Sequence, residues 1–153
     1  MKIPSLLHAV SLSLLFFSLS CAAQDRGYWR AASNTANSIT GDIEISDAKL
    51  TINFTSFRLV QARTLTAPEV SSVFDADVNA GPTGTLYHVP VPANKRFLHH
   101  NTLCGTEDTQ WMATYTSGRM LQVAFFSGTD APVFTFDAIR NSISLCGTFT
   151  YER

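Results

Sequence analysis

Residues 97–128, FLHHNTLCGTEDTQWMATYTSGRMLQVAFFSG, contain the hairpin pattern on which the predicted fold depends. Apolar and polar residues alternate over residues 111–116, and a second, more apolar run covers residues 121–126. Alternation with a period of two is typical of β-strands, and Ser117-Gly118 between the runs permits a tight turn with positive φ. The stretch therefore predicts an antiparallel hairpin whose second strand, apolar on nearly both faces, lies centrally in the sheet.

Similar alternation continues on both sides of this hairpin. Residues 39–45 and 49–55 predict two strands with a turn at residues 46–48, and residues 145–151 predict a terminal strand. Weaker extended runs cover residues 27–32, 57–65, 85–91 and 133–136, whereas residues 33–38 are rich in Ser, Asn and Thr and are expected to form a loop. Pro90 and Pro92 lack an amide donor, which places the 85–91 strand at a sheet edge.

One helix start has a specific signature. Thr66 and Glu69 match a capping box and Pro68 suits the first turn, so a short helix is expected to begin there and to end near Asp75. Helical turns are expected at residues 93–100 and 137–141, the second capped by Asp137. Together these elements predict a mainly β fold, α+β at most: a small antiparallel barrel or sandwich of about seven to nine short strands with one or two short helices.

The first 23 residues have the pattern of a secretory signal peptide. Lys2 supplies a positive charge, residues 6–19 are rich in leucine and phenylalanine, and Cys21-Ala22-Ala23 offers small residues for cleavage. The prediction is a signal peptide at residues 1–23 and a single secreted or periplasmic β-rich domain at residues 24–153. A lipid anchor at Cys21 is the alternative, because Leu19-Ser20-Cys21 partly matches a lipoprotein site. No transmembrane helix is expected.

Only two cysteines, Cys104 and Cys146, remain outside the predicted signal peptide. An even pair in an exported protein predicts one disulfide, and two buried free thiols are the alternative. The formal net charge of the chain is −1, and it contains no run of basic residues. This charge pattern argues against nucleic acid as a partner.

The polar loop before the hairpin holds most of the groups capable of chemistry. Binding residues often lie on such loops, so the predicted binding residues are His99, His100, Asn101, Glu107, Asp108 and Trp111. A zinc or copper site from His88, one of the paired histidines, and Glu107 or Asp108 is conceivable, but the spacing matches no metal motif. We therefore predict neither a metal nor a cofactor.

Catalytic signatures are weak. A G-x-S-x-G motif does not occur in residues 24–153, and pairing with Cys146 argues against Cys104 as a nucleophile. Asp75 and Asp77 could act as paired carboxylates, but such residues more often end a helix. The Asn53-Phe54-Thr55 sequon is expected within a strand. Five aromatic residues are expected in the core, with a ligand platform as the alternative: Trp29, Trp111, Tyr115, Phe125 and Phe126.

The sequence therefore favours an exported, non-catalytic binding module for a protein partner or a small apolar or saccharide ligand. The first alternative is a small periplasmic hydrolase or metal-binding enzyme that uses His99 or His100 with Glu107 or Asp108. The second is a structural component of the cell envelope. In size, export, single disulfide and strand-rich pattern, the chain resembles small periplasmic β-barrel modules such as lipocalin-like carriers and lysozyme-inhibitor-like barrels. This resemblance covers architecture, and no diagnostic residue of either family is carried over.

Overall fold

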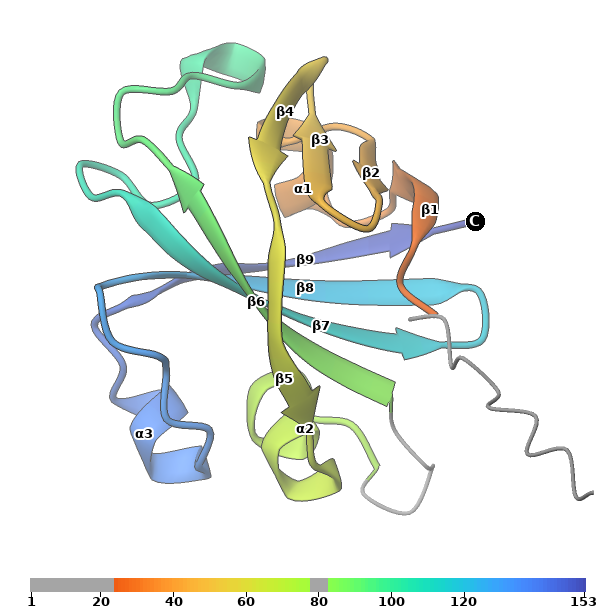
Figure 1. Cartoon of the computed structure of the whole chain (residues 1–153), viewed down its shortest axis with the longest axis vertical. Helices are drawn as coiled ribbons and strands as arrows, with labels where there is room; N and C mark the ends of the chain where they lie inside the picture. The colour runs from red at the N-terminus through yellow and green to blue at the C-terminus, as the bar shows by residue number, and fades with distance from the viewer. Residues whose placement is uncertain (1–23, 78–82) are drawn as a thin grey trace, which may run out of the picture.

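The computed structural model describes residues 24–77 and 83–153, so the predicted signal peptide and Cys21 lie outside the described residues. The described chain forms one nine-stranded antiparallel sheet in the order β4-β3-β2-β1-β9-β8-β7-β6-β5 (Figure 1). Its strands are β1 (Gly27–Ala31), β2 (Ile43–Ile45), β3 (Lys49–Ile52), β4 (Thr55–Arg58), β5 (Val60–Leu65), β6 (Thr83–Val91), β7 (Thr109–Ser117), β8 (Met120–Ser127) and β9 (Leu145–Glu152). The helices are α1 (Asn34–Ile39), α2 (Ala67–Phe74) and α3 (Phe136–Arg140), with a 3₁₀ turn η1 (Leu98–His100). The predicted antiparallel, mainly β fold is confirmed.

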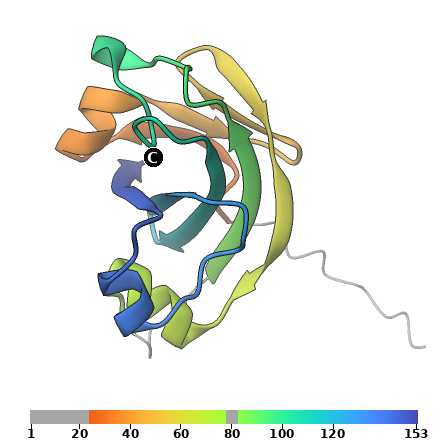
Figure 2. The same cartoon turned by 90° about the vertical axis from the view of Figure 1, so that its left-hand side faces the viewer.

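The sheet curls strongly but is not closed. Its two edge strands are β4, which pairs with β3, and β5, which pairs with β6. Only Leu59 separates these two strands in the chain, so one extended run of residues reaches both edges. Figure 2 shows this continuous run, coloured yellow, curving along one side of the folded sheet.

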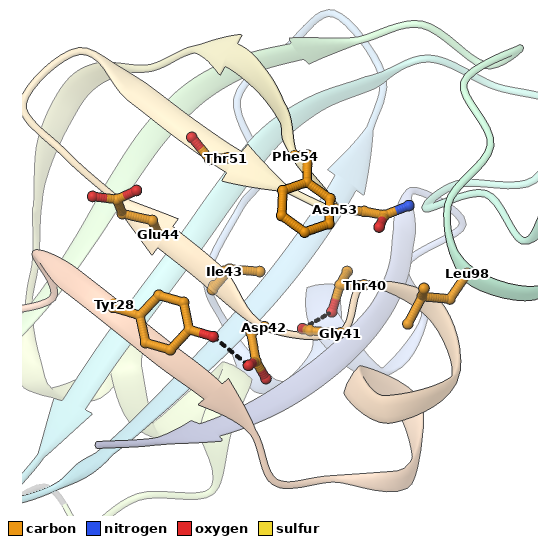
Figure 3. Close-up of a pocket in the computed structure, with 10 residues that line it drawn as sticks. All are labelled: Tyr28, Thr40, Gly41, Asp42, Ile43, Glu44, Thr51, Asn53, Phe54 and Leu98. Carbon is orange, nitrogen blue, oxygen red and sulfur yellow. Dashed lines mark hydrogen bonds between the residues drawn. The ribbon is translucent and has the colours of Figure 1, made fainter.

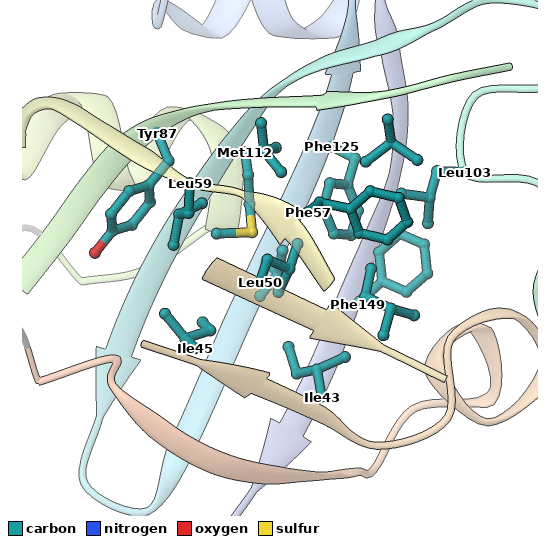
Figure 4. Packing of buried hydrophobic residues seen from close by; sticks show 14 of the residues in the cluster. Ile43, Ile45, Leu50, Phe57, Leu59, Tyr87, Leu103, Met112, Phe125 and Phe149 are labelled. Atoms are coloured by element: carbon teal, nitrogen blue, oxygen red, sulfur yellow. The ribbon is translucent and has the colours of Figure 1, made fainter. Parts of the chain in front are cut away.

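Apolar side chains fill the inside of the curl. Figure 4 shows side chains from β2 and β3 meeting those of β7, β8 and β9. The rings of Phe125 and Phe149 lie edge to face with centroids 5.2 Å apart, and neither has more than 1% of its surface exposed. Edge-to-face contact is a favoured arrangement of aromatic rings in cores. The inside of the curled sheet is therefore a packed core.

A second core lies between the sheet and helices α2 and α3. Phe74 of α2 stacks on Tyr115 of β7 at 6.0 Å, and both rings are buried. The predicted capping box of α2 is confirmed, because Glu69 Oε2 accepts the backbone N–H of Thr66 at 2.9 Å. Glu69 also receives two hydrogen bonds of 2.8 Å from the Arg63 guanidinium of β5, which joins the helix start to the sheet.

The predicted hairpin at the centre of the sheet is confirmed. β8 lies between β7 and β9, and its residues from Val123 to Ser127 are all buried. The Cys104–Cys146 disulfide joins the loop before β7 to β9, with the two Cα atoms 4.9 Å apart. Residues 27–31 and 145–152 form strands as expected.

A buried carboxylate ties the start of the described chain to these central strands. Asp25 is 3% exposed, and its carboxylate accepts the hydroxyls of Tyr87 at 2.9 Å and Thr114 at 2.6 Å. Burial, followed by the charge of Asp25, raises the pKa of Tyr87 well above its ordinary value. The backbone carbonyl of Asp25 accepts the indole N–H of Trp29 at 2.7 Å. These contacts anchor the segment that leads into β1.

Two local predictions were wrong because side-chain caps start helices there. Residues 33–38 form most of α1 rather than a loop, since the Ser33 hydroxyl accepts the N–H of Ala36 at 3.1 Å. As a result, the strand expected at residues 39–45 is reduced to β2. Residues 133–136 are not a strand, and α3 is capped by Thr135 rather than by Asp137.

The predicted edge position of residues 85–91 was also wrong. β6 lies between β5 and β7. Its pairing with β7 shifts register between His88 and Val91, a segment that includes Pro90. Proline is tolerated at such an irregularity because no regular ladder hydrogen bond is required of it.

Within residues 24–77 and 83–153, no helix combines the length and apolar character needed to cross a membrane.

Candidate functional site

A groove of about 500 Å³ lies on the outside of β1, β2 and β3, facing away from the packed core (Figure 3). Its volume is within the range of ligand-binding clefts, roughly 300–1,000 Å³. It is lined by Tyr28, Thr40, Gly41, Asp42, Ile43, Glu44, Thr51, Asn53, Phe54 and Leu98. None of the six residues predicted to bind a ligand is among them.

Phe54 stands at the tip of the β3–β4 hairpin, beside the groove. Ile52 pairs with Thr55, so Asn53 and Phe54 form a two-residue turn, and both have positive φ, 46° and 62°. The strand expected over residues 49–55 is therefore broken at this turn. The sequon is therefore not within a strand: Asn53 and Phe54 form the turn, and Thr55 is the first residue of β4. The Phe54 ring is 100% exposed.

The conformation of Phe54 is unusual for a bulky side chain. Two-residue hairpin turns with positive φ at both positions favour Asn-Gly, because glycine has no Cβ to clash with the backbone. A residue with a Cβ in the left-handed region costs roughly 1–2 kcal/mol. The phenylalanine ring recovers none of this cost by burial within the described chain. Such strained residues tend to occur at functional sites.

Tyr28 of β1 forms a second aromatic wall and is held in place by Asp42. The Tyr28 hydroxyl donates a hydrogen bond to Asp42 Oδ2, while Oδ1 accepts the backbone N–H of Ala31 at 2.9 Å. The hydrogen bond to Asp42 raises the pKa of Tyr28 above its ordinary value. The phenol oxygen is thus fixed while 58% of the residue remains exposed.

Glu44 of β2 occupies the middle of the exposed sheet face. It pairs across the strands with Tyr28 on one side and Thr51 on the other, and it is exposed. Within the described chain its carboxylate has neither an ion pair nor a hydrogen-bond partner. Asp42 and Glu44 are the two charged residues that line the groove, so the groove is acidic.

The opposite wall comes from the η1 turn, which packs closely on the end of α1. Gly41 has φ +62°, and a Cβ at this position would lie 3.1 Å from Leu98 Cδ1. Glycine therefore permits both the backbone conformation and the approach of Leu98. The turn is held by Ser38, whose carbonyl oxygen is 3.1 Å from His99 Nδ1 and accepts Asn101 Nδ2 at 3.1 Å.

The structure disperses the residues predicted to form the site. His99 and Asn101 contact Ser38, and Asp108 Oδ1 accepts the backbone N–H of Ala93 at 2.7 Å. His100 and Glu107 are exposed, and Trp111 lies edge to face on His88 with ring centroids 5.1 Å apart. Within residues 24–77 and 83–153, no three His, Cys, Asp or Glu side chains are arranged to hold a metal ion. The binding role of these residues remains a prediction.

The other candidate catalytic groups have structural roles. Asp75 is the left-handed C-cap of α2, with φ 51°. Ser46 and Lys49 match an S-x-x-K pattern that was not among the predicted catalytic signatures, and the Ser46 hydroxyl donates to the Lys49 carbonyl at 3.2 Å in the turn between β2 and β3. Four members of the predicted aromatic set are buried core, and the fifth, Trp111, is partly buried: the buried residues are Trp29, Tyr115, Phe125 and Phe126.

Sequence reasoning missed Phe54, Tyr28, Asp42 and Glu44. The available signal was Asn53, a residue that tolerates positive φ and favours turns. Reading Asn53 as a turn residue would have placed Phe54 at a hairpin tip.

Comparisons with protein-family models, with curated proteins and with solved structures found no match to this chain.

Proposed function

We propose that the protein is an exported, non-catalytic binding module that binds a protein partner across the groove on β1–β3. The main observation in support is Phe54, a fully exposed ring held in a backbone conformation that disfavours it. Large aromatic residues are enriched among the residues that dominate protein interfaces. Phe54 would therefore contact the partner directly.

A protein fits this surface better than a small molecule. Small ligands are usually bound in clefts that bury 70–90% or more of their surface. The inside of the curled sheet is packed with side chains, so it does not resemble the hollow of a carrier. On the outer groove, the exposed faces of Tyr28 and Phe54 extend over the sheet surface, and a broad partner would cover both rings.

Export is supported by the signal-like sequence of residues 1–23 and by the disulfide between Cys104 and Cys146. Disulfides persist in oxidising compartments. A binding role is supported further by the structural roles of Asp75, Ser46 and Asp108, which would otherwise be candidates for catalysis.

Photocrosslinking in the cells that make the protein tests this proposal. A photoreactive phenylalanine analogue replaces Phe54, and the same analogue replaces Phe136 in a control, because Phe136 is 61% exposed on α3. We expect one recurring protein adduct from position 54, identified by mass spectrometry, and none from position 136. Phe54→Ser should weaken binding of that partner by about 30-fold, as expected for loss of an interface hot spot. The absence of an adduct at position 54, or the same adducts at both positions, would refute the proposal.

A further inference from the structure

The charge of the groove gives its partner a chemical identity. Its lining contains two carboxylates, Asp42 and Glu44, and no lysine, arginine or histidine. The two cations nearest to Tyr28 in sequence both have acidic partners of their own: Arg26 pairs with Asp47, and Arg30 is 3.6 Å from Glu152 on β9. Lys49 and Arg58 pair across β3 and β4 on the same face, but neither lines the groove.

The two carboxylates have different roles. Asp42 is occupied on both oxygens, by the Tyr28 hydroxyl and by the Ala31 N–H, so it positions the ring. Glu44 lacks such partners within the described chain and is free to accept hydrogen bonds from a ligand. An uncharged or apolar partner that covered Glu44 would leave this carboxylate desolvated and unpaired, which is unfavourable. An acidic partner would be repelled.

The aromatic walls favour the same type of ligand. Figure 3 shows the rings of Tyr28 and Phe54 on either side of Ile43, whose own side chain is buried in the core, with Asp42 and Glu44 on the neighbouring positions of the chain. A cation close to an aromatic face is attracted by the negative potential of the ring. A long basic side chain can contact the two rings with its methylene groups while its charged end reaches Glu44.

We infer that the protein partner inserts a lysine or arginine side chain between Tyr28 and Phe54, where its charge is bound by Glu44. This inference rests on the proposed function and names the chemistry of the partner. The binding segment is a stretch of chain with at least one basic residue accessible from an extended backbone. Because Glu44 is exposed, the interaction weakens as ionic strength rises.

Selection from a displayed library of linear twelve-residue peptides tests the inference. Peptides are selected on the full exported protein and depleted on Phe54→Ser, so that those retained need the Phe54 ring. We expect enrichment of lysine and arginine over the unselected library. Binding of the selected peptides should fall about tenfold in Glu44→Gln, through loss of a charge-assisted contact. It should fall further in Glu44→Lys and remain unchanged in Asp130→Asn, which changes an exposed carboxylate outside the groove.

Three outcomes separate this inference from the proposed function. Enriched peptides that are neutral or acidic, or that bind Glu44→Gln as tightly as the unmodified protein, overturn the inference and leave the proposed function standing. A library that yields no peptide dependent on Phe54 also overturns it, because a basic linear segment is sufficient in the proposed complex. The photocrosslinking result at position 54 then decides the proposed function independently. Thermal unfolding of each variant serves as the control that it remains folded, so that a loss of binding is not caused by unfolding.

Discussion

Two hairpins of the same sheet have two-residue turns that differ in which residue type occupies the positions with positive φ. The β7–β8 turn is formed by Gly118 and Arg119, and its positive φ of 56° falls on the glycine. The β3–β4 turn is formed by Asn53 and Phe54, and its second positive φ falls on a phenylalanine. The first turn has the residue that its backbone favours, and the second does not.

The surroundings of the two hairpins explain this difference. β7 and β8 each have a strand on both sides and contribute buried residues to both cores, so errors in their pairing would disrupt the whole sheet. β4 is an edge strand, and the tip of its hairpin projects beside the groove. Proteins break local rules mostly where function requires it. The comparison implies that stability resides in the central strands, and it agrees with the proposed contact role of Phe54 in the outer hairpin.

The largest effect on stability is expected from the carboxylate that anchors the chain to the central strands. Asp25→Ala would remove the carboxylate that accepts the buried hydroxyls of Tyr87 and Thr114, and Thr114 would keep only its longer hydrogen bond of 3.4 Å to the Thr85 carbonyl. Because a buried donor without a partner is costly, we expect the free energy of unfolding to fall by about 3 kcal/mol. Urea unfolding measures this change, with Asp130→Ala as a matched exposed control. A loss below about 0.5 kcal/mol, the usual range for surface substitutions, would show that Asp25 is not an anchor.

Exchanging the turn chemistry of the two hairpins should produce effects of opposite sign. Phe54→Gly removes a Cβ from the left-handed region, so we expect the protein to gain about 1 kcal/mol of stability. The Phe54→Gly variant should also fail to bind the partner that photocrosslinking at position 54 identifies. Gly118→Ala introduces a Cβ at positive φ and should destabilise the protein by about 1 kcal/mol. Thermal unfolding of both variants tests the comparison directly, and it would fail if Phe54→Gly were destabilising.

The smallest effect concerns acid stability at the α2 start, far in sequence from the groove. Hydrogen bonds from Arg63 lower the pKa of Glu69 from its ordinary 4.5 to about 2. A lowered pKa in the folded state means that the contribution is complete above about pH 4.5 and is lost as the pH falls towards 2. The Arg63 side chain is 45% exposed, so solvent screening limits this contribution to roughly 0.5–1 kcal/mol.

Urea unfolding between pH 2 and pH 6 measures this contribution as the difference between the unmodified protein and Glu69→Gln. The difference should shrink as the pH approaches 2. A difference independent of pH would contradict the assigned ion pair. Binding of the partner at neutral pH should be the same in both proteins. This result would show that the contacts at the start of α2 contribute to stability but not to binding at the groove.

Strongly periodic segments could be assigned from sequence, and segments dominated by a single side-chain contact could not. The β7–β8 hairpin and the α2 capping box have several signals that agree, such as alternation with a glycine turn or Thr66 with Glu69. α1 depends on one serine cap within a polar run that is also typical of loops. The position of β6 inside the sheet depends on a register shift around Pro90, which has no local signature.

The predicted binding residues and the groove on β1–β3 lie in different parts of the molecule, and the sequence could not identify the groove for a related reason. Histidines and carboxylates in the loop before β7 suggested chemistry by residue type alone. Their contacts with Ser38 and Ala93 require segments distant in sequence to lie side by side. The groove likewise combines residues of β1, β2 and the β3–β4 turn with Leu98, and no spacing in the sequence relates them.

The amino-acid sequence by itself determined the strand-rich class, the central hairpin, the α2 start and the pairing of Cys104 with Cys146. These features follow from periodicity, from turn and capping chemistry and from the count of cysteines, all of which act locally or by elimination. Only the tertiary structure decided that Trp111 is partly rather than fully buried and that Phe54 is fully exposed. Burial is a property of packing between distant segments, so the same residue type can be fully buried in β8 and fully exposed at the tip of the β3–β4 hairpin.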